Sequence, residues 1–311
     1  MTSTFTPPAP LQTAVLFLVF NRPDTTAQVF EAIRQAKPPR LYVAADGPRQ
    51  GRAGEADLVA KVREIATAVN WHCEVKTLFR EENLGCKYAV SGAITWFFEQ
   101  EEQGIILEDD CLPSQSFFWF CEKLLELYKD DMRVGQISGF NLLGTFISGK
   151  DSYHFSNFGS IWGWASWRRA WIYYDLNMST FPLVEKRESL KASIIKNSEY
   201  KKRMKDFKAT FDGKIDTWDF QWIYARLVNR FLIVIPKISL VQNIGFGDGA
   251  THTVDVKNKL SLVKKANIDF PLIHPEILMP EIVFEKKVHE RKKINLIKKI
   301  TSRAKRILFN G

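Results

Sequence analysis

The sequence predicts an α/β fold in which a mainly parallel sheet is flanked by helices. Apolar runs at 15–20, 41–45 and 104–107 contain no charged residue, and such runs are typical of strands that are buried on both faces. Segments with apolar residues at helical spacing lie between the runs, and this alternation favours parallel strands joined by helices. The composition, with 45% hydrophobic and 25% charged residues, excludes a disordered or coiled-coil chain.

The predicted elements follow one another along the chain. The first strand leads into Asn21-Arg22-Pro23, and Asp24 or Thr25 caps the helix after it. Further strands are predicted at 41–45, 73–79, 104–107, 134–138 and 231–235, and helices at 54–69, 87–101, 117–128 and 184–209, with a last helix ending at Arg230. Residues 139–180 are rich in aromatic residues and contain glycines, and they are predicted to be irregular.

Three segments of the chain differ in composition. Residues 1–13 contain three prolines and no periodicity, which predicts a flexible lead. Residues 14–284 form the predicted folded domain. Residues 285–311 contain ten Lys or Arg against two Glu, whereas the whole chain has a net charge of +9. The folded domain is therefore nearly neutral, which does not support a nucleic-acid interface spread over the fold, and no nucleic acid is expected as a partner.

The basic tail has a helical pattern of its own. From Ile294 to Leu308 its apolar residues recur at spacings of three or four, with Lys and Arg between them. A basic amphipathic helix is typical of binding to an anionic membrane surface. A solvated helix or an RNA-binding tail is the alternative interpretation of residues 285–311.

The cysteines and the N-terminal residues indicate the cellular compartment in which the protein is expected. The four cysteines form no CxxC pair, which favours a reducing compartment over a disulfide scaffold or a zinc site. No Lys or Arg precedes the first apolar run, so the start does not resemble a signal peptide. That run is far shorter than the about 20 residues that a membrane span needs. A cytoplasmic protein is expected, or one that is peripheral at the inner face of the cell membrane.

Acidic residues end two of the predicted strands. Glu108-Asp109-Asp110 follows the run at 104–107, and Asp46 follows the run at 41–45. In open α/β sheets the ligand crevice lies outside the carboxyl ends of the strands, and a hard divalent cation takes carboxylate oxygens there. The alternatives are a set of turn acids before the Ser114 cap and an Asp-Gly-Pro turn at Asp46.

Several motifs in this order resemble one family of enzymes. FNRPDTTAQVFEAI, YVAADGP, NLGCKYAV and GIILEDDCLPSQSFF, followed by WGWASWRRAW and TWDFQWIYARLVNR, are similar to motifs of the GT-A fold nucleotide-diphospho-sugar glycosyltransferases. The resemblance is to inverting N-acetylglucosaminyltransferases of early N-glycan processing and to bacterial polysaccharide glycosyltransferases, and it covers about residues 14 to 252. It implies a Rossmann-like, mostly parallel sheet with helices on both sides.

The resemblance implies a site for a nucleotide-sugar and a metal ion. Asp110 would bind Mn²⁺ or Mg²⁺ directly, Asp109 would face the ribose or the sugar, and Glu108 would support the uracil or ribose side. Asp46 would contact the base. The remaining nucleotide-sugar candidates are Asn21, Arg22 and Lys87. Lys87 is equally consistent with a surface lysine.

A carboxylate near the start of a late helix would be the catalytic base in such an enzyme, because an acceptor hydroxyl is a weak nucleophile. Asp219 is the first candidate and Asp216 the second; the related Golgi enzymes have two adjacent acids here, whereas this chain has Asp219-Phe220. The alternative is that either Asp caps the helix. His252, in a late glycine-rich loop, is a second metal-ligand candidate, with a surface or core histidine as the alternative.

The aromatic segment supplies candidates for binding sugar faces. Trp162 and Trp164 flank Gly163 in the region predicted to be irregular, and they are the candidate platform for the acceptor or the donor sugar. Packing in the core is the alternative for both.

Together these patterns predict a metal-dependent glycosyltransferase. It would move a sugar from a nucleotide-sugar, UDP-linked and with inversion, to a hydroxyl of a surface glycan or a lipid-linked acceptor. A sugar nucleotidyltransferase is one alternative, although no glycine-rich signature follows the first strand. A non-catalytic glycan- or membrane-binding protein on the same fold is the other. A dehydrogenase is disfavoured because GxGxxG is absent after that strand.

Overall fold

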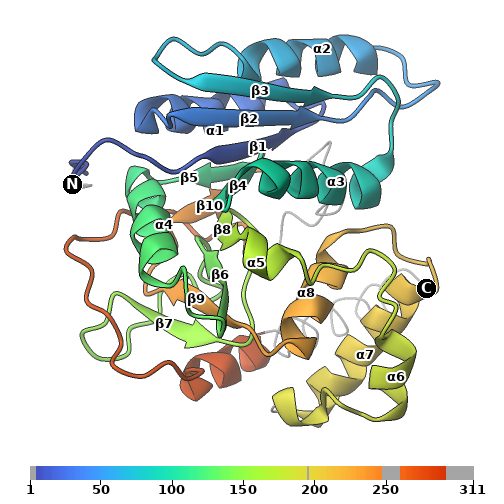
Figure 1. Ribbon diagram of the computed structural model, residues 1–311, viewed down its shortest axis with the longest axis vertical. Coiled ribbons are helices and arrows are strands. Elements are labelled where there is room, and N and C mark those ends of the chain that lie inside the picture. Colours follow the sequence, from blue (N-terminus) through green and yellow to red (C-terminus); the bar gives the residue numbers. More distant parts are fainter. Residues whose placement is uncertain (1–4, 195, 247–259, 292–311) are drawn as a thin grey trace, which may run out of the picture.

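The computed structural model describes residues 5–194, 196–246 and 260–291. Within these residues the fold is a mixed α/β arrangement around an eight-stranded sheet, with strand order β3-β2-β1-β4-β8-β6-β9-β7 (Figure 1). Strands β5 and β10 form a separate antiparallel pair. The α/β class predicted from the sequence is confirmed.

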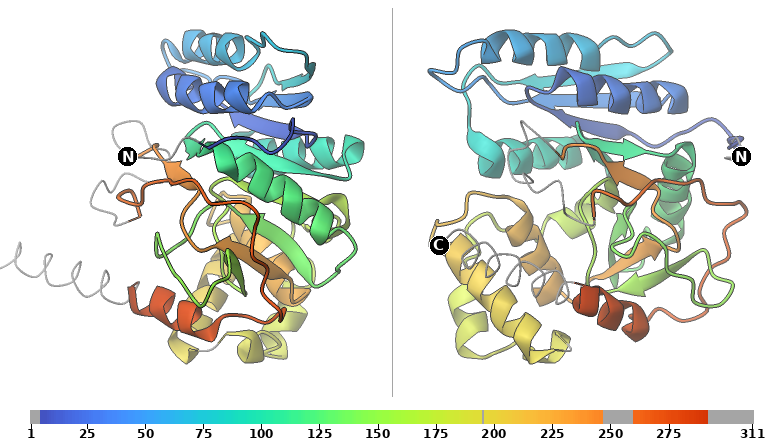
Figure 2. Two further views of the ribbon diagram at one scale, coloured as in Figure 1. Left: turned by 90° about the vertical axis from the view of Figure 1, so that its left-hand side faces the viewer. Right: turned by 180° about the vertical axis from the view of Figure 1, so that it is seen from behind.

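The first half of the chain builds one edge of the sheet. Parallel strands β1, β2, β3 and β4 lie side by side, with helices between them. The bounds are β1 Val15–Val19, α1 Pro23–Ala36, β2 Arg40–Ala45, α2 Glu55–Ala66, β3 Glu74–Phe79, α3 Gly85–Gln100, β4 Gln103–Glu108, β5 Cys111–Pro113 and α4 Gln115–Leu127. Figure 2 shows the same stack from the side and from behind.

The second half of the chain completes the sheet in a different order. The bounds are β6 Val134–Ser138, β7 Tyr153–Ser156, β8 Trp164–Trp167, α5 Arg168–Trp171, α6 Phe181–Lys186, a 3-10 turn Lys191–Ser193, α7 Asn197–Phe211, α8 Asp219–Val228, β9 Leu232–Pro236 and β10 Val241–Asn243. Residues 282–291 are helical as well. The long helix predicted at 184–209 is thus two helices with a 3-10 turn between them.

The sheet is mixed, which corrects the expectation of a mostly parallel one. Strand β8 runs antiparallel to both of its neighbours, β4 and β6, and β7 runs antiparallel to β9. The reason is the aromatic segment, which was predicted to be irregular: residues 164–167 are fully buried in mid-sheet. Trp164 packs on one face of the sheet and Trp167 on the other, as alternation along a strand requires.

Two apolar layers cover the two faces of the sheet. Val15, Phe17 and Val19 of β1 belong to the layer under α1, α2 and α4, whereas Leu16 and Leu18 belong to the layer under α3, α5 and α8. A strand that is buried on both faces needs apolar residues at every position, which is why the run at 15–20 contains no polar residue. This packing holds the carboxyl ends of β1, β2 and β4 next to one another.

The segment at 285–311 begins on the body of the protein. Phe284 and Val288 are buried with Ile233 and Ile235 of β9, and Glu285 accepts hydrogen bonds from the Ser156 hydroxyl and from the backbone N–H of Asn157. Residues 292–311, and with them most of the predicted amphipathic helix, lie outside the described residues. None of the helices in the part of the chain that the structure describes is both long and apolar enough to cross a membrane.

Candidate functional site

A cavity of about 790 Å³ lies at the carboxyl ends of β1, β2 and β4. Its lining includes residues that directly follow these strands and residues of the segment that leads into α8. Of the candidate site residues, the following line this cavity: Asn21, Arg22, Asp46, Glu108, Asp109, Asp110, Trp162, Asp216 and Asp219. Residues far apart in the sequence thus meet in one place, because parallel strands end at the same edge of the sheet.

Arg22 links the first strand to the acidic triplet. Its guanidinium donates to Asp109 Oδ1 and, at 3.0 Å, to Asp110 Oδ2, and the backbone N–H of Phe20 donates to Asp109 Oδ2 at 3.3 Å. Gly245 lies against this pair, and a Cβ at that position would collide with the Asp110 carboxylate and the Arg22 guanidinium. The ion pair therefore requires a glycine on the neighbouring loop.

The acidic triplet is only partly neutralised by Arg22. One carboxylate oxygen of Glu108 is buried and has no hydrogen-bond partner among the residues that the structure describes. Burial raises the pKa of Glu108 well above its usual value, and the neighbouring Asp110 and Asp109 raise it further. Burial also raises the pKa of Asp109, although Arg22 opposes the rise. An excess of buried carboxylates over cations favours a positively charged ligand at this corner.

This corner has the oxygen donors that a divalent cation takes, but not a complete set of protein ligands. Oxygen donors suit Mg²⁺ or Mn²⁺, and Mg²⁺ is commonly held by one or two carboxylates while substrate phosphates supply further oxygens. Within residues 5–194, 196–246 and 260–291, no group of three or more His, Cys, Asp or Glu side chains is placed to hold a metal ion. These residues therefore do not supply a complete set of metal ligands in the absence of substrate. His252 lies outside them.

Asp46 has a structural partner as well as a place in the cavity. Its carboxylate accepts the backbone N–H groups of Leu84, at 3.0 and 3.1 Å, and of Gly85, at 3.0 Å. It thereby satisfies donors at the N-terminus of α3, which otherwise lack partners. Asn83 donates to the Gly47 carbonyl nearby. Asp46 therefore ties the end of β2 to the start of α3.

Asn21 is held by a residue that the sequence pattern did not single out. Its side-chain amide donates to Glu55 Oε1 at 2.9 Å, and Glu55 also accepts from the backbone N–H of Arg49 at 2.7 Å. The Arg49 side chain pairs with Glu55 and lies 5.4 Å from the Phe20 ring centre. The bonds from Arg49 hold the pKa of Glu55 at about 2. Arg49, Arg80 and Lys214 also line the cavity.

Asp216 and Asp219 line the cavity at the approach to α8. Asp219 is the first residue of α8, whose N-cap is Trp218 without a side-chain capping bond, so neither Asp is the cap. The Thr217 hydroxyl donates to Asp219 Oδ1. A Cβ on Gly85 would lie 3.3 Å from Asp216 Oδ2, so Asp216 lies against the start of α3.

The pKa of the Cys86 thiol depends on the charges that surround it in the cavity. Its pKa is raised to about 12, mainly by burial and further by the negative charges of Glu108, Asp219, Asp216 and Asp46. Carboxylates that follow β2 and β4 and those at the approach to α8 therefore act on one side chain.

Two of the candidate residues are not in the cavity. Trp164 is a correction to the expected sugar platform: its side chain is 0% exposed and packs among Trp171, Trp218 and Trp222. Its place on a central strand leaves no face for a ligand. Lys87 does not line the cavity either, because α3 turns Cys86, Ala89 and Val90 toward it; the Lys87 ammonium lies over the Tyr88 ring.

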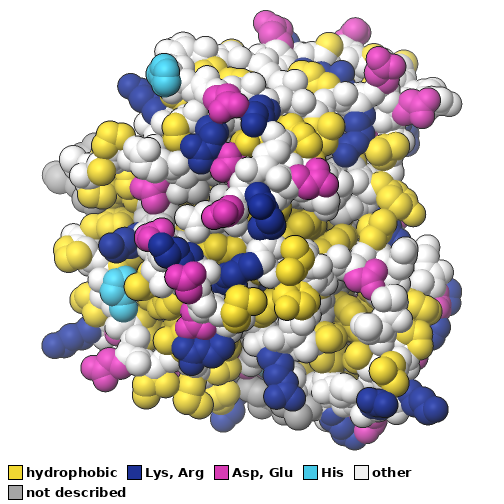
Figure 3. Space-filling model, in the orientation of Figure 1, with side chains coloured by type: hydrophobic (Ala, Val, Ile, Leu, Met, Phe, Trp, Pro, Cys, Tyr) yellow, Lys and Arg dark blue, Asp and Glu magenta, His cyan; other side chains and the backbone are white. Residues whose placement is uncertain are grey.

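Charged side chains of both signs are mixed over the face of the molecule in Figure 3. Lys and Arg lie among Asp and Glu on this face, with hydrophobic side chains between them. This surface differs from the strand-end corner of the cavity, where three consecutive acids share one arginine.

Comparisons with known proteins leave the family open. No protein-family model matches the sequence, and no curated protein matches it. Among solved structures, HddC from Yersinia pseudotuberculosis, also solved in complex with GMP-PN, shares 9% and 10% identity at a TM-score of 0.31, covering 51% of this chain and 78% of that chain. UDP-glucose pyrophosphorylase in complex with UDP-glucose shares 11% identity at a TM-score of 0.27, covering 48% of this chain and 64% of that one. Similarity at this level supports no conclusion about the activity of this chain.

Proposed function

We propose that this chain is a metal-dependent glycosyltransferase that uses a nucleotide-sugar donor. One observation supports the proposal most: a single cavity joins the acids that follow β4 to the acids at the approach to α8. A transferase of this kind needs a site for a diphosphate and, on the other side of the reacting carbon, a carboxylate that takes a proton.

The residues at the strand ends would bind the nucleotide diphosphate. Arg22 is held in place by Asp109 and Asp110, and Arg49, Arg80 and Lys214 add positive charge around the cavity. Asn21, fixed by Glu55, would donate to the nucleotide, and the Asp46 side would face the base. Guanidinium groups suit phosphate oxygens because they donate two parallel hydrogen bonds.

Asp110 would hold a Mn²⁺ or Mg²⁺ ion, and Glu108 would lie at the same corner of the cavity. When bound, such an ion neutralises charge that develops on the diphosphate as it leaves. The unpartnered oxygen of Glu108 supports this assignment, since a buried carboxylate oxygen without a donor is costly. A second ligand from His252 remains a prediction from the sequence.

Asp219 would act as the base, with Asp216 as the alternative. The acceptor hydroxyl oxygen forms the new bond to the anomeric carbon of the sugar, and its proton passes to the Asp219 carboxylate. The bond from that carbon to the diphosphate breaks, and its electron pair leaves with the diphosphate oxygen. Attack from the side opposite the leaving group inverts the anomeric carbon.

The acceptor would enter beside Trp162. This side chain lines the cavity and packs edge-on against Phe140 and Phe246, which leaves it suited to a sugar face. The donor nucleotide is proposed as UDP and the acceptor as a surface glycan or a lipid-linked glycan. Docking of residues 285–311 on an anionic membrane surface, with the protein at the inner face of the membrane, belongs to the same proposal.

Product analysis with variants tests the reaction. Incubation with UDP-sugars and Mn²⁺ should release UDP as the sugar is transferred to an acceptor or, slowly, to water. Asp219→Asn should lower turnover by roughly 10²–10⁴-fold, the usual contribution of a general base, while UDP binding is retained. Asp216→Asn serves as the matched variant at the approach to α8.

Two results would contradict the proposal. Consumption of a sugar 1-phosphate and a nucleoside triphosphate, with release of pyrophosphate, would identify a nucleotidyltransferase. Binding of glycans without any turnover of a donor, unchanged in Asp110→Asn, would identify a non-catalytic binding protein.

A further inference from the structure

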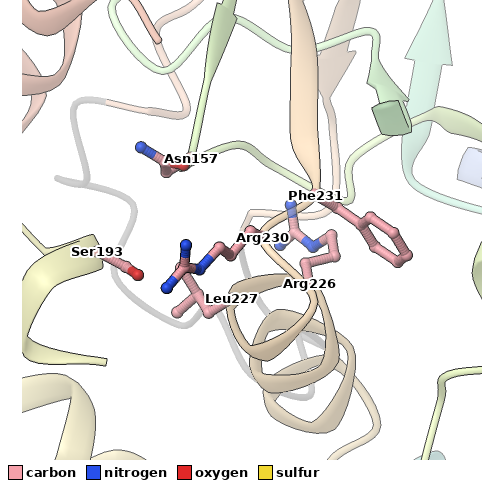
Figure 4. A pocket seen from close by; sticks show the side chains of 6 residues that line it. All are labelled: Asn157, Ser193, Arg226, Leu227, Arg230 and Phe231. Carbon is pink, nitrogen blue, oxygen red and sulfur yellow. The ribbon is translucent and has the colours of Figure 1, made fainter. Parts of the chain in front are cut away.

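A smaller cavity, of about 260 Å³, lies at the other end of α8. It is lined by Asn157, Ser193, Arg226, Leu227, Arg230 and Phe231 (Figure 4). None of these residues lines the large cavity. The two cavities are therefore separate sites that share one helix, with Asp219 in its first turn and Arg226 in its last.

Arg226 is a buried cation that has no polar partner for its side chain among the described residues. The residue is 2% exposed, and its Nε and Nη1 atoms are buried with no hydrogen-bond acceptor in this part of the chain. Burial and, to a smaller extent, the positive charge of Arg203 together lower its pKa to about 9, and Asp219 opposes the change. The Trp222 ring, 5.9 Å from the guanidinium carbon, is its one aromatic contact among the described residues.

An unpaired buried charge of this kind is expensive. Leaving a buried ionised donor unsatisfied costs several kcal/mol or more, so native proteins pair such groups with an opposite charge. A guanidinium stays protonated at neutral pH even with this shift. Among the described residues no carboxylate forms an ion pair with Arg226 at 4.0 Å or less, and an anion that enters the cavity would supply one.

Arg230 adds a second cation at the mouth of this cavity. It is exposed and follows the end of α8 with a φ of 56°, a left-handed conformation that is uncommon for a residue other than glycine. Figure 4 shows its side chain extending toward Ser193, whereas the Phe231 ring turns away. The left-handed backbone thus directs a guanidinium over the cavity in which Arg226 lies.

We propose that this cavity is a binding site for an oxyanion, a phosphate or carboxylate group of a small ligand. Both arginines line this one cavity, and a guanidinium binds such groups in two-pronged pairs. The Ser193 hydroxyl is a further donor on the same wall, and the Asn157 amide is engaged with Glu285. The site stands apart from the proposed transferase chemistry and does not depend on it.

Thermal unfolding with inorganic phosphate or acetate, each compared with chloride at equal ionic strength, tests the site. Phosphate, acetate or both should raise the unfolding temperature of the full-length protein, and the anion that does so identifies the class of ligand. Arg230→Gln removes an exposed group and should weaken the apparent affinity about tenfold, because one charge-assisted hydrogen bond is lost. Arg187→Gln, which removes an exposed arginine elsewhere, should behave as wild type.

Arg226→Met separates this site from binding in the large cavity. It should raise the unfolding temperature without any anion, because the unpaired buried charge is gone, and it should abolish the response to the anion. The proposal is overturned if neither anion stabilises the wild-type protein. It is also overturned if Arg230→Gln and Arg226→Met respond to the anion as the wild type does, since binding would then be at the arginines of the large cavity or elsewhere.

Discussion

The reactivity of Cys86 measures the electrostatics of the large cavity directly. Its thiol lines that cavity, and its pKa is raised to about 12, first by burial and then by Glu108, Asp219, Asp216 and Asp46. An alkylating reagent reacts with the thiolate and not with the thiol. The rate of alkylation therefore depends on the charges that surround this sulfur.

The expected magnitude follows from the pKa. A rise from 9.0 to about 12 lowers the thiolate fraction at neutral pH about 1000-fold, because each pKa unit is a factor of ten. A more basic thiolate is a better nucleophile, and a Brønsted slope of about 0.4–0.5 recovers roughly 20-fold. Cys86 should therefore react about 50-fold more slowly than an ordinary thiol, before any effect of access.

The pH dependence separates charge from access. Iodoacetamide labelling of Cys86, followed by peptide mass spectrometry, should rise about tenfold per pH unit from pH 7 to 10 without levelling off. Asp216→Asn should shift the profile to lower pH, whereas Asp130→Asn, at an exposed site away from the cavity, should not. A rate that levels off near pH 9, with Asp216→Asn identical to wild type, would refute a cavity dominated by carboxylates.

Two further substitutions test the packing beside the acidic triplet and around β7. Gly245→Ala should cost about 1–3 kcal/mol of unfolding free energy and weaken nucleotide binding, because its Cβ would displace Asp110 from Arg22; urea unfolding that matches wild type would contradict this. His154 lies buried between the Phe146 and Phe284 rings, with Nε2 unpartnered, and burial lowers its pKa to about 4. The unfolded chain takes up its proton near pH 6.5 but the folded protein does not, so stability falls by up to about 3 kcal/mol as the pH drops from 6.5 to 4. His154→Phe should remove that part of the pH dependence in urea midpoints, and identical pH profiles of the two proteins would contradict the assignment.

The sequence predicted what depends on local pattern. Uninterrupted apolar runs gave the buried strands, and the acids after 104–107 and 41–45 were expected at one sheet edge because parallel strands end together. The structure brings Asp46 and Asp109 into the same cavity. Strand direction beyond β4 was not predictable in this way, since β8 contacts β4 only after the chain has returned through β6 and β7.

The sequence patterns did not reveal residues whose role depends on contacts with distant parts of the chain. Glu55 is the first residue of a helix, where an acidic residue is common. It nevertheless accepts a hydrogen bond from the side chain of Asn21, which lies 34 positions earlier in the sequence. Arg80 and Lys214 reach the cavity from loops that carry no motif. Trp164 shows the opposite failure: two tryptophans around a glycine suggested an exposed platform, but the alternating faces of β8 bury it.

Calorimetric titration of nucleoside diphosphates, with and without Mn²⁺, tests the central claim most directly. We expect one nucleoside diphosphate to bind the wild-type protein in the presence of Mn²⁺ and to bind much more weakly after chelation or in Asp110→Asn. Equal binding with and without the metal, or heats that Asp110→Asn leaves unchanged, would contradict the assignment of the acidic triplet to a cation and a diphosphate.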